Sequence, residues 1–169
     1  ASAAGGIVGY SRGMIISCAS SVKIYGNGRL GGIAGAGYGT YIVNCGVYDS
    51  EITLFLVKEN REAGGLIGYA ATRTLATGCT VSNTVVRYAG AEDIALQDIA
   101  PYIGKAVGLL NESNIYDVSA ENSTLDPGDL NENYVITGKV FNQKINFGTG
   151  PNGIYGALQS NSFVIMNAA

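Results

Sequence analysis

Three cysteines recur along the chain, and their chemistry is the first to consider. They are Cys18, Cys45 and Cys79, and histidine is absent from all 169 residues. Thiolates bind zinc when cysteines are closely spaced, as in Cys-x-x-Cys pairs, and histidine is their usual companion. The long intervals between these cysteines match no such motif, and an odd number cannot pair fully in disulfides. We therefore predict buried free thiols and no metal site.

A stretch rich in acidic and amide side chains lies at residues 126–133. Asp126, Asp129 and Asn131 carry oxygen atoms of the kind that calcium prefers. The stretch lacks the glycine position and the closing glutamate of an EF-hand loop, and it begins with an Asp-Pro-Gly sequence that is typical of a turn. A solvated turn is therefore the preferred interpretation, and calcium binding is the alternative.

Several other carboxylates would matter if the protein cleaved polysaccharides. Glycoside hydrolysis uses two carboxyl groups that face each other across the scissile bond. Sequence alone places no such pair, scattered surface charges explain these side chains equally well, and histidine, the commonest general base, is missing. We therefore expect no enzyme activity and no cofactor. The carboxylates that an enzyme would have to use are Glu51, Glu59, Glu62, Asp117 and Glu121.

Composition and charge narrow the class of protein. Hydrophobic residues make up 47% of the chain and charged residues 14%, a balance that disordered chains do not have. The 10 basic residues are scattered and the net charge is −3, so we expect no nucleic-acid partner. No apolar run is long enough to span a membrane. Tyr10 and Tyr69 follow equivalent glycines, and we expect them to stack at a corner, with sugar or protein binding as the alternative.

An internal repeat predicts the elements that position these residues. The motif Gly-Gly-apolar-apolar-Gly occurs three times, and a degraded fourth copy at 104–108 has Lys105 in place of the second glycine. Each cysteine heads a strand-like run at a nearly constant distance after its motif, and Val118 takes the cysteine's place in the fourth copy. The glycines of the three copies are Gly5, Gly6 and Gly9, then Gly31, Gly32 and Gly35, then Gly64, Gly65 and Gly68.

The spacing within each repeat is nearly constant, whereas the spacing between repeats varies. That pattern is typical of stacked coils whose outward loops absorb changes in length. We therefore predict an all-β fold, a right-handed parallel β-helix or solenoid of about four to five irregular coils. Residues 1–125 would form the repeat coils, and residues 126–169 would form divergent terminal coils or a cap. A short helix is expected at 93–99, within one outward loop.

The repeat resembles the GLUG family, which is named for its glycine–leucine–any–glycine core. Gly65-Leu66-Ile67-Gly68 fits that core directly, whereas Gly6-Ile7-Val8-Gly9 and Gly32-Ile33-Ala34-Gly35 fit with substitutions. The resemblance covers residues 5–125. It implies a bacterial secreted or cell-surface protein, since such repeats occur in adhesin-like chains and beside the catalytic domain of IgA1-cleaving metalloproteases. That catalytic domain needs a His-Glu-x-x-His site, which a chain without histidine cannot form.

Together the repeat and the resemblance favour a non-catalytic structural or adhesive module of an extracellular bacterial surface protein. The alternatives are an accessory domain that flanks a secreted metalloprotease and a β-helix that binds or cleaves carbohydrate. A host or cell-surface protein or glycan is the expected partner. Open ends of such a stack are bare strand edges, so they are expected to dock on neighbouring domains or on copies of the chain.

Overall fold

The chain is all-β and its strands pair in parallel, which confirms the fold class and the strand direction predicted from the sequence. The structure is a computed structural model, and the residues that it describes are 2–55, 61–90, 102–126, 155–159 and 163–165. These ranges contain no α-helix, and therefore none that is long and apolar enough to cross a membrane. The predicted helix at 93–99 lies outside the described residues.

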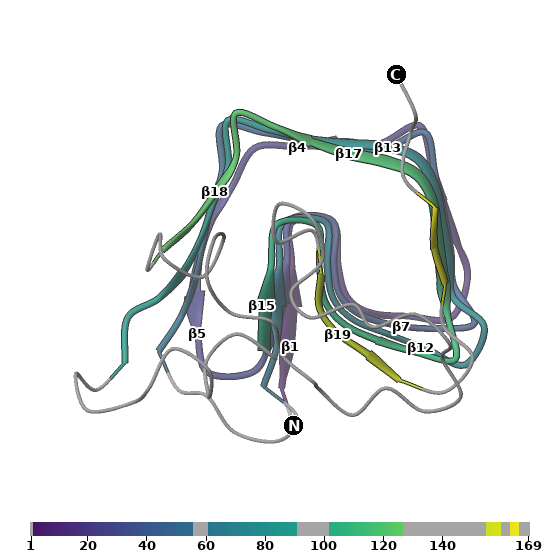
Figure 1. Ribbon diagram of the computed structural model, residues 1–169, viewed down its shortest axis with the longest axis horizontal. Helices are drawn as coiled ribbons and strands as arrows, with labels where there is room; N and C mark the ends of the chain where they lie inside the picture. Colours follow the sequence, from purple (N-terminus) through teal and green to yellow (C-terminus); the bar gives the residue numbers. More distant parts are fainter. Residues whose placement is uncertain (1, 56–60, 91–101, 127–154, 160–162, 166–169) are drawn as a thin grey trace.

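Four parallel sheets enclose the interior (Figure 1). Sheet 1 contains β1 (Ala3–Gly5), β6 (Arg29–Gly31), β11 (Ala63–Gly64) and β15 (Ile103–Gly104). Sheet 2 contains β2 (Val8–Ser11), β7 (Ala34–Tyr38), β12 (Ile67–Ala71), β16 (Val107–Asn111) and β19 (Tyr155–Gln159). Sheet 3 contains β3 (Met14–Ile16), β4 (Ala19–Ser20), β8 (Tyr41–Val43), β9 (Gly46–Tyr48), β13 (Leu75–Ser82), β17 (Asn114–Glu121) and β20 (Phe163–Ile165). Sheet 4 contains β5 (Lys23–Gly26), β10 (Glu51–Leu54), β14 (Val85–Tyr88) and β18 (Thr124–Asp126).

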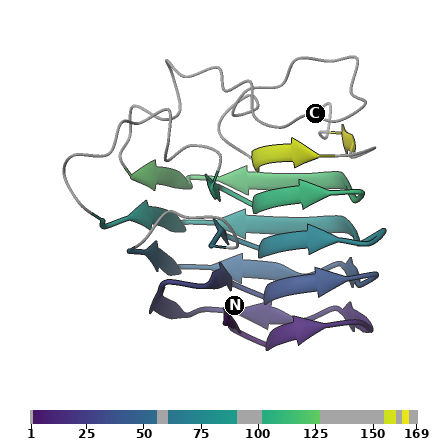
Figure 2. The same cartoon turned by 90° about the horizontal axis from the view of Figure 1, so that it is seen from below.

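Each repeat of the sequence supplies strands to all four sheets, and we call each such set of strands a layer. Layers 1 to 4 are residues 3–26, 29–54, 63–88 and 103–126. Strands β19 and β20 continue sheets 2 and 3 beyond layer 4. Figure 2 shows the strands stacked one above another. The register aligns the glycine motifs, because Gly31 lies opposite both Gly5 and Gly64 in its two neighbouring strands.

The glycine motif lies where sheet 1 turns into sheet 2, and we call this corner the fold-back. In Figure 1 sheet 1 runs up the middle of the cross-section, and sheet 2 then runs back beside it before curving away. The two backbones approach so closely that a Cβ atom on Gly68 would lie 2.6 Å from the Leu30 nitrogen. A Cβ on Gly32 would instead collide with the carbonyl oxygen of Gly65 in the next layer. Glycine is therefore required at these positions by space.

The degraded fourth copy of the motif keeps the same register as the others. Gly104 lies opposite Gly64, and Val107 lies opposite Ile67. The Gly65 N–H donates to the carbonyl oxygen of Lys105 at 3.1 Å, as the Gly32 N–H donates to Gly65 at 2.9 Å. Burial lowers the pKa of the Lys105 side chain. Replacing the second glycine with lysine thus leaves the strand pairing of layer 4 intact.

The fold-back divides the interior into two hydrophobic clusters (Figure 1). The larger cluster lies between sheets 2 and 3, and the smaller cluster lies between sheets 1 and 4. Inward side chains repeat at the same register in successive layers, so each cluster is a set of stacked columns. One column of the larger cluster is Ile15, Ile42, Ala76 and Ile115. One column of the smaller cluster is Ile52, Val86 and Leu125.

The corner that precedes sheet 3 is held by buried hydroxyl groups that the repeat analysis did not single out. The Thr40 N–H donates to the hydroxyl of Thr74 at 3.1 Å, and the Thr74 N–H donates to the hydroxyl of Ser113 at 3.1 Å. All three residues are almost fully buried. Hydroxyl groups thus accept the hydrogen bonds of these two backbone N–H groups where the backbone turns.

Candidate functional site

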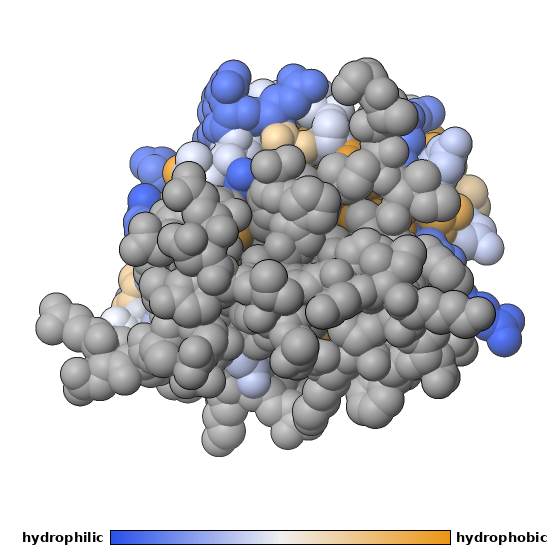
Figure 3. All heavy atoms as spheres, in the orientation of Figure 1, coloured by the Kyte–Doolittle hydropathy of each residue, from blue (hydrophilic) through white to orange (hydrophobic). Residues whose placement is uncertain are grey.

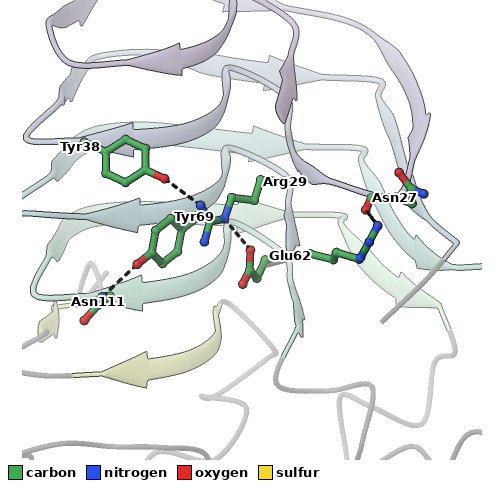
Figure 4. A network of polar contacts seen from close by, with 7 residues as sticks. Asn27, Arg29, Tyr38, Glu62, Tyr69 and Asn111 are labelled. Atoms are coloured by element: carbon green, nitrogen blue, oxygen red, sulfur yellow. Dashed lines mark hydrogen bonds and ion pairs between the residues drawn. The ribbon is translucent and has the colours of Figure 1, made fainter. Parts of the chain in front are cut away.

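A buried ion pair lies in the fold-back, on the side where sheet 1 faces sheet 2 (Figure 4). Arg29 begins β6 in layer 2, and Glu62 directly precedes β11 in layer 3. The Arg29 Nε atom donates to Glu62 Oε2 at 3.0 Å, and the two side chains are only 10% and 3% exposed. Buried opposite charges need such direct pairing, because each one alone would lose its hydration without compensation.

Two tyrosines contact the Arg29 guanidinium. The guanidinium carbon lies 3.8 Å from the ring centroid of Tyr69, and Nη1 donates to the hydroxyl of Tyr38 at 2.7 Å. The Tyr69 hydroxyl in turn accepts a hydrogen bond of 2.9 Å from the Asn111 amide. A cation over a ring face and charge-assisted hydrogen bonds are both strong where water is largely excluded. The cluster therefore connects layers 2, 3 and 4 through side chains.

Three tyrosines form a row along the stack of layers. The expected stacking of Tyr10 on Tyr69 does not occur directly, because Tyr38 lies between the two rings. Tyr38 stacks on Tyr10 with ring centroids 6.2 Å apart and meets Tyr69 edge-on at 5.8 Å. Both Tyr10 and Tyr69 lie in register with Ala36, so the small alanine leaves room for Tyr38 between them. Burial raises the pKa of Tyr38, and the Arg29 charge opposes that rise.

A second cross-layer contact lies near the first. The Arg61 Nη1 atom donates to the carbonyl oxygen of Asn27 at 2.6 Å, which joins layer 3 to the turn that precedes layer 2. The Arg29 and Glu62 side chains, by comparison, form an ion pair with each other. Both are too deeply buried to reach a substrate as a nucleophile or a general base. The arrangement is suited to clamping layers together, and it suggests no chemical step.

Sequence reasoning placed Glu62 only among scattered carboxylates and missed Arg29, Tyr38 and Asn111. A signal for the ion pair was nevertheless present, because Arg29 stands two residues before Gly31 and Glu62 stands two residues before Gly64. Opposite charges at the same offset in consecutive repeats become neighbours on adjacent parallel strands. Nothing comparable marked Tyr38, which lies two residues beyond the position that Tyr10 occupies in its own repeat.

The three predicted cysteines lie in one column of sheet 3, together with Val118 of layer 4. All three are free thiols, and Cys45 and Cys79 are buried, whereas Cys18 in layer 1 is half-buried. The Cys79 thiol donates to the carbonyl oxygen of Thr77 at 3.3 Å. Burial raises the pKa of Cys45 and raises that of Cys79 to about 11. Raised pKa values keep these thiols protonated and unreactive at neutral pH.

The predicted calcium ligands lie only partly within the described residues. Asp126 ends β18 and its carboxylate forms an ion pair of 2.8 Å with Arg87, whereas Asp129 and Asn131 lie outside the described residues. The described ranges hold no group of three histidine, cysteine, aspartate or glutamate residues that would suit a metal ion. The calcium prediction therefore stays a prediction.

The described carboxylates considered for catalysis lie in three parts of the fold. Glu51 lies on β10 and pairs with Lys23 at 3.7 Å, whereas Glu62 is buried against Arg29 in the fold-back. Asp117 and Glu121 belong to β17, and both are exposed. Glu59 lies outside the described residues.

Comparison of the chain with models of protein families, with curated proteins and with solved structures finds no match.

Proposed function

We propose that the chain is a right-handed parallel β-solenoid of four to five coils and that it serves as a non-catalytic structural or adhesive module of an extracellular bacterial surface protein. One observation carries this proposal. Each strand of one layer pairs in parallel with the equivalent strand of the next, with the glycine motifs in register. Stacked repeats of this kind make stiff rods with extended outer surfaces, and such surfaces are used for display and binding.

The likeness of the glycine motif to the GLUG repeat supports the surface location. The state of the cysteines is compatible with it, because thiols in an oxidising environment persist only when they are shielded. Burial and raised pKa values shield Cys45 and Cys79 in this way. Cys18 is the least protected member of the column.

Surface display tests the proposed role. The chain would be anchored on a bacterial cell that does not adhere by itself, and adhesion to epithelial cells and to a glycan array would be measured. We expect adhesion to rise with the display of the folded chain and to disappear with an unfolded variant. Equal adhesion with folded and unfolded chains would contradict an adhesive role. Hydrolysis of a polysaccharide that is lost in Glu51→Gln or Asp117→Asn would contradict the non-catalytic role.

Carbohydrate binding without cleavage is the second candidate. The row of Tyr10, Tyr38 and Tyr69 supports it, because sugars stack on aromatic rings and Tyr10 is 46% exposed. Under this alternative Tyr10→Ala abolishes retention on particular glycans and leaves the thermal stability almost unchanged. The matched control is Tyr25→Ala, since Tyr25 is more exposed and lies on sheet 4, away from the row.

A further inference from the structure

The outer face of the first part of sheet 3, at residues 14–16, 41–43, 75–77 and 114–116, is uncharged and largely apolar, whereas the later part of β17 carries the exposed Asp117 and Glu121. Four side chains of this face are large and strongly exposed, with Met14 at 64%, Tyr116 at 53%, Ile16 at 48% and Tyr41 at 47%. In Figure 1 sheet 3 runs along the top and the right-hand side of the cross-section, and in Figure 3 hydrophobic residues show among hydrophilic ones at the right-hand edge. Contiguous exposed apolar residues mark interaction surfaces more often than isolated ones do.

The strand register gives this face a regular composition. One outward column is Met14, Tyr41, Leu75 and Asn114. The second outward column is Ile16, Val43, Thr77 and Tyr116. None of these eight residues is charged. The outer face of sheet 4, by contrast, carries the ion pairs Lys23–Glu51 and Arg87–Asp126.

Three exposed charges flank one edge of this face, namely Arg12 in layer 1, Arg73 in layer 3 and Glu112 in layer 4, and Gly39 takes the equivalent place in layer 2. Arg12 precedes Met14 by two residues in layer 1, and Glu112 precedes Asn114 by two residues in layer 4. Both side chains are exposed, and within the described part of the chain neither forms an ion pair. If a second copy faced this surface with its layers in the reverse order, Arg12 of each copy would lie opposite Glu112 of the other.

We propose that this uncharged face, formed by the two columns in the first part of sheet 3, binds a second copy of the chain through a two-fold axis that lies in the interface parallel to the strands. This axis places layer 1 of one copy against layer 4 of the other. Arg12 then meets Glu112 of the second copy twice, as an isologous interface requires. Ile16 meets Tyr116, and Tyr41 meets Leu75.

The charges select this geometry over the other two-fold arrangement of the same faces. An axis parallel to the stack would place each layer against its own equivalent with the strands reversed. Glu112 would then lie opposite Asp117, which follows Tyr116 at the other edge, and two negative charges would be brought together. Like charges in an interface suppress the pairing that brings them together. The arrangement with the axis parallel to the strands has attraction at both ends.

The size of the face predicts a weak complex. The strands of layers 1 to 4 that this axis superposes are about 4.8 Å apart and each about five residues long, and they define an area on the order of 300 Å² per copy. Strand β20, which pairs with β17, projects beyond layer 1 of the other copy. Stable interfaces bury about 800 Å² per partner, so self-association should be concentration-dependent and readily reversible. This interface is a property of the isolated chain and does not depend on the proposed surface role.

Sedimentation equilibrium of the purified chain at low ionic strength, from about 20 μM to about 2 mM, tests the inference at concentrations that suit weak complexes. We expect the average mass to rise toward that of a dimer, and the association to weaken as salt screens the Arg12–Glu112 pairs. Tyr41→Lys should raise the dissociation constant at least about tenfold, since it buries a charge in an apolar contact. The matched control is Tyr25→Lys on sheet 4, which should leave the association unchanged.

A charge exchange tests the geometry separately. Arg12→Glu should raise the dissociation constant about tenfold, and adding Glu112→Arg to the same chain should restore it. Circular dichroism of each variant verifies that the fold is retained, which the exposure of all these positions predicts. A monomer at every concentration would overturn the proposal. A dimer that withstands Tyr41→Lys would also overturn it and would place self-association elsewhere, for example at the strand edges of layer 1.

Discussion

The fold-back and the cysteine column both hold neighbouring layers together, but they do so by different physical means. In the fold-back, Arg29 and Glu62 form one directional, buried, charge-assisted contact between layers 2 and 3. In the cysteine column, Cys45 and Cys79 repeat the same small apolar contact from layer to layer. The ion pair stabilises the fold only when both charged partners are present. The cysteine column requires only that each of its side chains is small and apolar. Substitutions should therefore have very different costs in the two regions.

Removing one charge of the fold-back should have the largest effect. Glu62→Ala leaves the Arg29 guanidinium buried without its counter-charge, and we expect a loss of about 3–5 kcal/mol in the free energy of unfolding. Chemical denaturation measures this loss. Replacing both partners, as Arg29→Met with Glu62→Leu, should restore most of the stability because no unpaired charge remains. If the double variant is as unstable as the single one, the importance of charge pairing in this region is refuted.

A size-compatible change in the cysteine column should cost much less. Val118 already occupies the position next to Cys79 in this column, so the column accepts valine in layer 4. Cys79→Val should therefore change the free energy of unfolding by less than about 1.5 kcal/mol, as hydrophobic exchanges of similar volume do. The same denaturation experiment measures it. A cost as large as that of Glu62→Ala would mean that the two regions do not differ as described.

Alkaline pH should also act on the cysteine column. Burial raises the pKa of Cys79 from the ordinary value of 9.0 to about 11. Between these values the unfolded chain releases the thiol proton and the folded chain retains it, so this contribution to stability is complete below pH 9 and is lost as the pH approaches 11. The stability of Cys79→Val should therefore improve relative to that of the natural chain over this window. Urea denaturation at both ends of the window measures it, and parallel curves would contradict the raised pKa.

The two regions also differ in how much of each was predictable from the sequence. The cysteine column was predictable because Cys18, Cys45 and Cys79 stand at nearly the same distance after each glycine motif. In-register parallel stacking converts an equal distance along the chain into proximity in space. The all-β class and the parallel pairing follow from the same regularity, and both are confirmed.

The fold-back was predictable only in part. The glycines indicated a tight corner, but not that sheets 1 and 2 approach until a Cβ on Gly68 would meet the backbone of Leu30. The place of Tyr38 between Tyr10 and Tyr69 depends on Ala36, whose small side chain matters only once the strands are stacked. Such contacts cross between sheets, so no fixed spacing along the chain encodes them.

The sequence by itself determined the strands, their parallel order and the columns of residues that repeat between layers. All of these follow from local spacing, since each repeat imposes the same constraint on the next. Only the tertiary structure decided that Arg29 and Glu62 are buried together and that Tyr69 lies under the guanidinium. Those outcomes depend on how closely sheet 1 and sheet 2 pack, because burial is what makes the pairing of these charges obligatory.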